Sequence, residues 1–137
     1  MKKYELTEET FTVFGKTLYR IRAVRDFGSV KTGEFGGYIE KEENLSHFGN
    51  AWVYGNAEVF NTRHFFVQGP IGSRDGYVTF YRTKDDTVEV RCGCFSGSLQ
   101  EFVNQVEETH GGSRYEKEYK LAAELAKVCI RLEGESR

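Results

Sequence analysis

The sequence has little proline and cysteine, no excess of positive charge and no long apolar run. Because Pro70 is the only proline, the rest of the chain is free to form regular structure. The three cysteines are an odd set, for which free thiols in a reducing cytoplasm are the simplest expectation. The absence of a membrane-helix or signal-peptide pattern likewise predicts a cytoplasmic protein that does not bind membranes.

The charge balance argues against a general nucleic-acid binder. Lys and Arg number 19 against 21 Asp and Glu, and the net charge is −2. Nucleic-acid-binding proteins usually present a basic face, so direct nucleic-acid binding is not expected, although the first predicted hairpin is locally basic. Cys92, Cys94, Cys129 and His110 lack the paired spacing of structural zinc ligands, so no metal or other cofactor is predicted.

Residues 44–61 contain an internal repeat, which reads as three consecutive hexads, NLSHFG, NAWVYG and NAEVFN. Small or apolar residues fill the second position, and glycine or asparagine ends each hexad, as sharp backbone corners require. A six-residue period with a corner in each unit is typical of the left-handed parallel β-helix, in which three hexads form one coil. The repeat therefore predicts a short β-helix-like coil.

The rest of the chain predicts an α+β protein. An N-terminal β-hairpin is expected at residues 11–24, a short strand at 64–68 and a second hairpin at 77–92. Two helices follow, each with a capping box, Ser98 with Glu101 and Ser113 with Glu116. We expect a β region at 1–63 with hairpin and coil, and a ββαα region at 64–137, packed as one compact unit.

Two turns with the same tripeptide, Gly-Ser-Arg, suggest an anion site. The tripeptide occurs at 72–74 and at 112–114, where it opens the second predicted helix. Backbone N–H groups at a helix start, together with arginine and histidine side chains, can bind a phosphate or carboxylate. The candidate anion-binding residues are Ser73, Arg74, His110, Ser113 and Arg114, and ordinary capping with two exposed arginines is the alternative.

Aromatic residues of the hexads suggest a protein-binding strip. Trp52 and Glu58 share the third hexad position, which faces outward if the second and fourth positions pack inside. Exposed aromatic side chains are favoured anchors at protein interfaces. The candidate partner-binding residues are Trp52, Tyr54, Glu58 and Phe60, and burial of these rings under the C-terminal region is the alternative.

The hexads Gly-Asn-Ala-x-Val-[Tyr/Phe] at 49–60 resemble those of small proteins encoded by phages and prophages of Firmicutes. The C-terminal region is similar to the segment that often follows such arrays, through the segments 72–74, 79–81, 92–95, 97–99, 109–111 and 119–127. The resemblance implies a phage accessory protein, a class that often inhibits bacterial defence. The resemblance does not imply any particular activity.

Three functions are compatible with these features. The first is stoichiometric, non-enzymatic binding of a bacterial host protein, in the manner of an anti-CRISPR inhibitor of a Cas effector. The second is a sponge that holds an anionic, nucleotide-like small molecule at the paired Gly-Ser-Arg turns. The third is a remnant hexapeptide acyltransferase with His47 as its base. A homo-oligomer is plausible in each case, because a short coil with open ends gains from stacking on another subunit.

Overall fold

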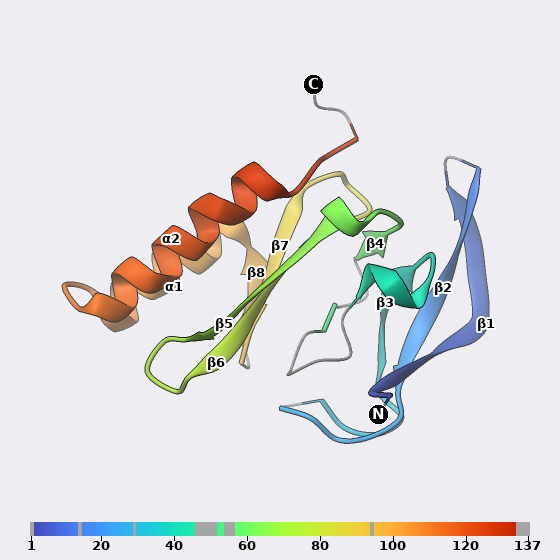
Figure 1. Ribbon diagram of the computed structural model, residues 1–137, viewed down its shortest axis with the longest axis horizontal. Helices are drawn as coiled ribbons and strands as arrows, with labels where there is room; N and C mark the ends of the chain where they lie inside the picture. Colours follow the sequence, from blue (N-terminus) through green and yellow to red (C-terminus); the bar gives the residue numbers. More distant parts are fainter. Residues whose placement is uncertain are drawn as a thin grey trace.

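Two four-stranded β-sheets and two C-terminal helices make up the fold, which confirms the predicted α+β class (Figure 1). This computed structural model describes residues 2–13, 15–28, 30–45, 52–53, 57–93 and 95–133. The helices lie on one side of the second sheet, and the first sheet lies on its other side (Figure 1). Neither helix is both long and apolar enough to cross a lipid bilayer.

The first sheet has the strand order β1-β2-β3-β4. Its strands are β1 (Tyr4–Val13), β2 (Lys16–Ala23), β3 (Phe35–Ile39) and the short β4 (Glu58–Val59), with one 3₁₀ turn, η1 (Glu42–Asn44), between β3 and β4. β1 and β2 form the predicted N-terminal hairpin, although the first strand begins seven residues earlier than residue 11. β3 and β4 are parallel, with Tyr38 opposite Glu58 and Ile39 opposite Val59.

Side-chain alternation in β2 follows the sequence pattern at one end only. Ile21 and Ala23 are buried and Arg22 is exposed, as period-two alternation predicts. Leu18 is also buried, although it belongs to the opposite parity. The pairing of β1 with β2 is irregular between Leu6 and Thr10.

The hexad region is described only in part. Leu45, Val53, Ala57 and Val59, at second and fourth hexad positions, are all fully buried, as the repeat predicts. This segment also contributes β4, which pairs in parallel with β3. His47 and Tyr54 lie outside the described residues, and the left-handed coil itself stays a prediction.

The second sheet is an antiparallel meander with the order β5-β6-β7-β8. After η2 (Thr62–His64), its strands are β5 (Phe65–Ile71), β6 (Gly76–Arg82), β7 (Val88–Cys92) and β8 (Phe95–Ser98). The predicted hairpin at 77–92 is confirmed as β6–β7. β8 was not predicted, so the C-terminal region contains four strands before its two helices instead of a simple ββαα unit.

The helices are α1 (Leu99–His110) and α2 (Arg114–Cys129). α1 has the predicted capping box, because Ser98 Oγ accepts from the Glu101 N–H at 3.1 Å and the Glu101 carboxylate accepts from the Ser98 N–H at 2.8 Å. The second predicted box is wrong. Ser113 Oγ instead donates to the His110 carbonyl at 2.7 Å, and Glu116 accepts from the Gly112 N–H at 2.9 Å.

Each face of the second sheet contributes to a separate apolar core. Val78, Phe80 and Val90 pack with α1 and α2. Tyr81 packs on the other face in one cluster with Ile21 of the first sheet and with Trp52, and half-buried Phe65 and Val67 lie against the same cluster. We call the contact between the two sheets the seam. The segments on either side of the predicted boundary at residue 63 are therefore joined by a shared core.

Candidate functional site

A pocket of about 520 Å³ lies at the end of the second sheet, and we call it the sheet-end pocket. Five segments of the chain line it: the turn near Phe27, the β5–β6 turn, the β7–β8 turn, α1 and Tyr119 of α2. Its volume falls within the usual range of small-molecule sites, about 300–1,000 Å³. The loop between β2 and β3 and the β5–β6 turn lie toward the same end of the molecule (Figure 1).

The charged side chains that line the sheet-end pocket are two arginines. Arg74, Arg91 and His110 all line it, and among the described lining residues none is an aspartate or a glutamate. Arg91 is 5% exposed, whereas Arg74 lies exposed in the β5–β6 turn. Guanidinium groups bind carboxylates and phosphates with paired hydrogen bonds, so this lining favours an anion.

The apolar lining of the sheet-end pocket is aromatic. The rings of Phe95 and Phe102 have centroids 5.7 Å apart, and Phe102 meets Tyr119 edge-on at 5.7 Å. His110 lies over Tyr119 at 5.4 Å, with the two rings tilted by 31°. Phe27 and Tyr77 complete the aromatic lining. Aromatic faces and edges of this kind pack well against a flat ring system such as a nucleobase.

Tyr119 is held in place between the helices and the sheet. Burial raises the pKa of its phenol to about 12, with the nearby Cys92 thiol adding to the effect and the Arg74 charge opposing it. Tyr119 is therefore a neutral hydroxyl at physiological pH, able to donate one hydrogen bond. The Cys92 thiol and the Arg74 guanidinium both lie near this phenol.

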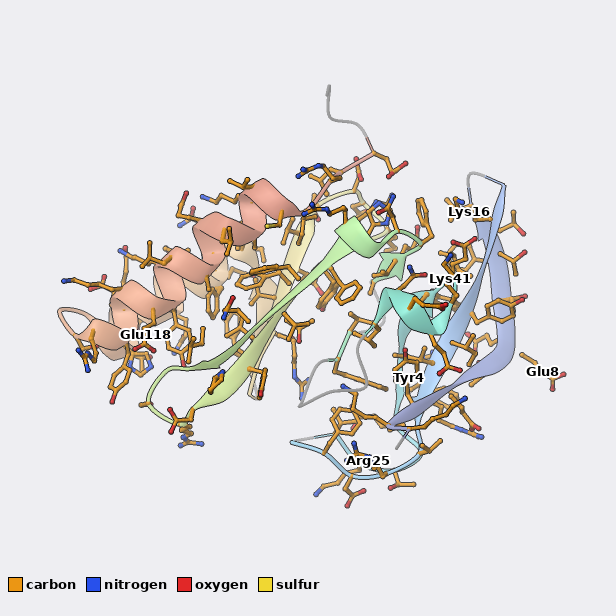
Figure 2. All side chains as sticks on the ribbon, viewed as in Figure 1. Tyr4, Glu8, Lys16, Arg25, Lys41 and Glu118 are labelled. Atoms are coloured by element: carbon orange, nitrogen blue, oxygen red, sulfur yellow. The ribbon has the colours of Figure 1, made fainter. Side chains whose placement is uncertain are left out.

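The β5–β6 turn is docked onto α2. The Gly72 N–H donates to the Glu118 carboxylate at 2.7 Å. Figure 2 shows Glu118 near the first turns of α2, on the side of this β-turn. A Cβ atom on Gly72 would lie only 1.9 Å from the Tyr119 hydroxyl, and the backbone φ of +81° is itself in the left-handed region. The turn that carries Ser73 and Arg74 is thus fixed against the pocket wall.

The predicted anion-binding residues divide into two groups. Ser73, Arg74 and His110 all line the sheet-end pocket, although they come from a turn and a helix 36 residues apart. Ser113 and Arg114 are not among its lining residues. Ser113 is engaged with the His110 carbonyl, and Arg114 is an exposed first residue of α2. The two Gly-Ser-Arg turns therefore do not form one joint site.

The predicted aromatic strip is not an exposed surface at the positions that the structure describes. Trp52 is fully buried and Phe60 is 6% exposed, so the expectation that these rings face outward is wrong. Trp52 packs edge-on against Phe27 and Tyr4, where the seam and the first sheet cover it. Glu58 is partly buried and lies 3.7 Å from Arg82, and Tyr54 lies outside the described residues.

Sequence reasoning missed the pocket residues that lie within strands and helices, apart from His110 at the end of α1. Arg91 alternates with Val90 in a predicted strand, and this pattern normally indicates a solvent-facing arginine. The first sheet covers that face instead. Four of the segments that carry the phage resemblance contribute residues to this pocket: 72–74, 92–95, 109–111 and the start of 119–127. The resemblance of these segments was the one sequence signal that pointed to them.

Among the residues that the structure describes, no group of three His, Cys, Asp or Glu side chains lies close enough together to hold a metal ion. The two described cysteines, Cys92 and Cys129, form no disulfide bond.

Comparison of the chain with models of protein families, with curated proteins and with solved structures gave no match. The function is therefore argued from the pocket itself.

Proposed function

We propose that the protein is a non-enzymatic binding protein that sequesters a small anionic, nucleotide-like molecule in the sheet-end pocket. The observation that carries the proposal is the lining: two arginines and a histidine, several aromatic rings, and no carboxylate among the described lining residues. Phage or prophage origin, which the sequence resemblance implies, fits a sponge for a signal of the infected cell.

Charge and ring chemistry together select the ligand class. A purely apolar ligand does not match the charge of the exposed Arg74, and an inorganic anion leaves the aromatic wall unused. A nucleotide uses both, because its phosphate matches a guanidinium and its base packs against a ring. Tyr119, a neutral donor, can add a hydrogen bond to a base or a phosphate oxygen.

The repeated Gly-Ser-Arg tripeptide supplies a matched test. Arg74→Ala removes a pocket arginine, whereas Arg114→Ala removes an exposed arginine from the same tripeptide outside the pocket. A hydrogen bond to a charged group is worth about 1.5–3 kcal/mol, so Arg74→Ala should weaken binding about 10- to 100-fold. Arg114→Ala should leave the affinity unchanged.

The measurement begins with a thermal-shift screen of wild type against AMP, GMP and their cyclic mono- and dinucleotides, since a ligand of the native state raises the melting temperature. Hits are then titrated calorimetrically against both variants. Equal affinity of the Arg74→Ala and Arg114→Ala proteins for a hit, or the lack of any hit at millimolar ligand, would contradict the proposal.

Stoichiometric binding of a bacterial protein, such as a CRISPR effector, is our second proposal. The observation that favours it is an apolar stripe on α2, where Leu121, Leu125 and Val128 are 70%, 46% and 70% exposed. Exposed apolar stripes at helical spacing are typical of protein-binding faces. A tagged pull-down from a CRISPR-bearing lysate, with and without nuclease, tests it with Leu121→Lys as the matched variant.

We also propose that residues 44–61 form a single hexapeptide coil that serves as scaffold. The parallel pairing of Tyr38–Ile39 with Glu58–Val59 supports this, because neighbouring β-helix strands are parallel. The buried second and fourth hexad positions support it as well.

A further inference from the structure

One face of α1 forms a wall of the sheet-end pocket. The residues that line the pocket from this helix have the spacing of a single helical face: Phe102, Gln105, Val106 and Thr109. Phe102 and Val106 are buried in the core beneath the wall, whereas Gln105 and Thr109 are exposed. A ligand can therefore reach this polar pair without displacing any core residue.

The Gln105 side chain is held by its neighbour one turn later. Its Nε2 donates a hydrogen bond to Thr109 Oγ1 at 2.9 Å. Within the part of the chain that the structure describes, this is the only hydrogen bond of the Gln105 side chain, so Oε1 and the second N–H can bind a ligand. Because Thr109 already orients the amide, less side-chain freedom is lost when a ligand binds.

Gln105 is the only side-chain amide among the described residues that line the pocket. An amide presents a donor and an acceptor on two neighbouring atoms in one plane, whereas a guanidinium group only donates. The edge of a nucleobase has the same paired arrangement. The 6-amino group of adenine and the ring nitrogen beside it are the usual partners of a glutamine amide.

A ring suited to the face of a base lies next to this wall. Phe95 is half-buried, and its ring centroid is 5.7 Å from that of Phe102, one turn before Gln105. An accessible aromatic ring packs against the flat face of a nucleobase and binds any base in this way. The edge contact with Gln105 can therefore distinguish one base from another, whereas the contact with Phe95 cannot.

The groups suited to a phosphate lie farther along the same wall. Arg74 is near the Tyr119 phenol, and the His110 ring centroid is 5.4 Å from that of Tyr119. His110 follows Gln105 by five residues, which corresponds to about 7.5 Å along a helix axis. A nucleotide carries its base and its phosphate at opposite ends of a ribose. A base at Gln105 thus leaves the phosphate free to extend toward Arg74 and His110.

We infer that the ligand carries adenine, and that Gln105 selects this base by hydrogen bonds to its 6-amino edge, with Thr109 as a positioning residue. The inference rests on the proposed function and deepens it. Adenine pairs its 6-amino donor with a ring-nitrogen acceptor on both of its exposed edges. Guanine has two acceptors, O6 and N7, on one of these edges, which a single amide cannot match.

The test combines two ligands with two proteins in calorimetric titrations. AMP is compared with purine riboside 5′-monophosphate, which differs from AMP only in lacking the 6-amino group. Wild type should bind AMP at least about fivefold more tightly, the lower value for a paired contact with a base, and should bind GMP more weakly than AMP. Gln105→Met keeps the side-chain length and helix propensity, and it should bind AMP and the purine analogue with equal affinity. Thr109→Val should reduce the preference for AMP.

Gln100 offers a matched control on the same helix. Its Nε2 donates to Asn104 Oδ1 at 2.9 Å across the same four-residue spacing, and Gln100 is not among the residues that line the sheet-end pocket. Gln100→Met should keep the wild-type preference for AMP. Urea unfolding checks that each variant folds, and Gln105→Leu replaces Gln105→Met if the latter does not.

The outcomes separate the adenine inference from the proposed function. Equal wild-type affinity for AMP and the purine analogue, equal affinity for AMP and GMP, or binding of another nucleotide without AMP overturns the inference and leaves the proposed function standing. A preference for AMP that survives in Gln105→Met, or that Gln100→Met loses to the same extent, also overturns it. If no nucleotide binds wild type, both claims fall together.

Discussion

Gly72 shows how one residue without a side chain shapes the candidate site. Its φ of +81° is in the left-handed region, and its missing Cβ leaves room for the Tyr119 hydroxyl. Gly112 has a nearly identical φ of +83°, but a Cβ there would meet nothing within 4 Å. The two glycines therefore separate the cost of the backbone conformation from the cost of displacing Tyr119.

Gly112→Ala should lower the free energy of unfolding by roughly 1–2 kcal/mol, the ordinary cost of a left-handed residue with a Cβ. Gly72→Ala should lower the free energy of unfolding by more than Gly112→Ala does, because Tyr119 must move as well. It should also weaken ligand binding at the sheet-end pocket. Urea unfolding of both variants measures the difference. The same loss of stability in both would show that Tyr119 gives way at no cost.

The sequence alone predicted some of the residues of the candidate site. For other residues the predicted exposure to solvent was wrong, and the reason was the same in each case. Arg74 and His110 were among the predicted anion-binding residues, because each lies beside a glycine-rich turn and can form a hydrogen bond to a phosphate. Trp52 and Arg91 sit in positions whose local pattern faces solvent, yet Trp52 is fully buried and Arg91 nearly so. The other sheet covers both of them, and local alternation carries no information about a second layer.

At the scale of elements, the start of α1 depends on a reciprocal cap. Ser98 is also the last residue of β8, so the chain passes from strand to helix without an intervening loop. The Ser98 and Glu101 side chains satisfy two backbone N–H groups at this junction. Capping of this kind fixes where a helix begins.

Ser98→Ala should lower the free energy of unfolding by about 1 kcal/mol, the usual loss for an N-cap serine. Ser96→Ala is the matched control, since Ser96 is an exposed serine on the same strand that caps no helix, and it should stay within about 0.5 kcal/mol of wild type. Thermal and urea unfolding provide the comparison. An equal effect of both substitutions would assign the loss to β8 instead of the cap.

Elements with strong local signals were predicted well. The β6–β7 hairpin and both helices follow from alternation, turn residues and the glycines at 111–112. β8 escaped prediction because FSGS has no strand-like apolar pattern, and its pairing with β7 comes from the neighbouring strand. The Ser113 box matched its sequence motif, but the tight turn after α1 directs that hydroxyl to the His110 carbonyl instead.

At the scale of the whole molecule, His64 ties the segment after α2 back to the sheets. Its ring is fully buried, and Nδ1 accepts from the Phe60 N–H at 3.2 Å while Nε2 lies 2.8 Å from the Glu133 carboxylate. The Glu133 N–H donates to Asp86, and the Arg131 N–H donates to the Arg63 carbonyl. A neutral imidazole with its proton on Nε2 fits both contacts.

Burial lowers the pKa of His64 below its ordinary value of 6.5, and the Glu133 carboxylate partly opposes this. The unfolded chain therefore binds a proton more readily than the folded chain just below pH 6.5. The free energy of unfolding should fall as the pH drops through this range.

Urea unfolding between pH 7.5 and 5 measures this dependence. His64→Asn, which keeps an acceptor for the Phe60 N–H, should show a weaker loss on acidification than wild type. Glu133→Gln should show a stronger loss, because it removes the group that raises the His64 pKa. If the free energy of unfolding of the His64→Asn protein depended on pH as strongly as that of wild type, groups other than His64 would cause the acid sensitivity.

The strand connections also set an order of assembly. Each strand of the second sheet pairs with its neighbour in sequence, whereas β3 and β4 pair across 20 residues. Local pairings form faster than distant ones, so the unit from β5 to α2 should fold first and offer Tyr81, Phe65 and Val67 as a template for the first sheet. Because Phe27 lies in the connection between β2 and β3 and packs in the core that the first sheet completes, the sheet-end pocket should be completed last. A bound ligand should therefore slow unfolding and leave the folding rate unchanged.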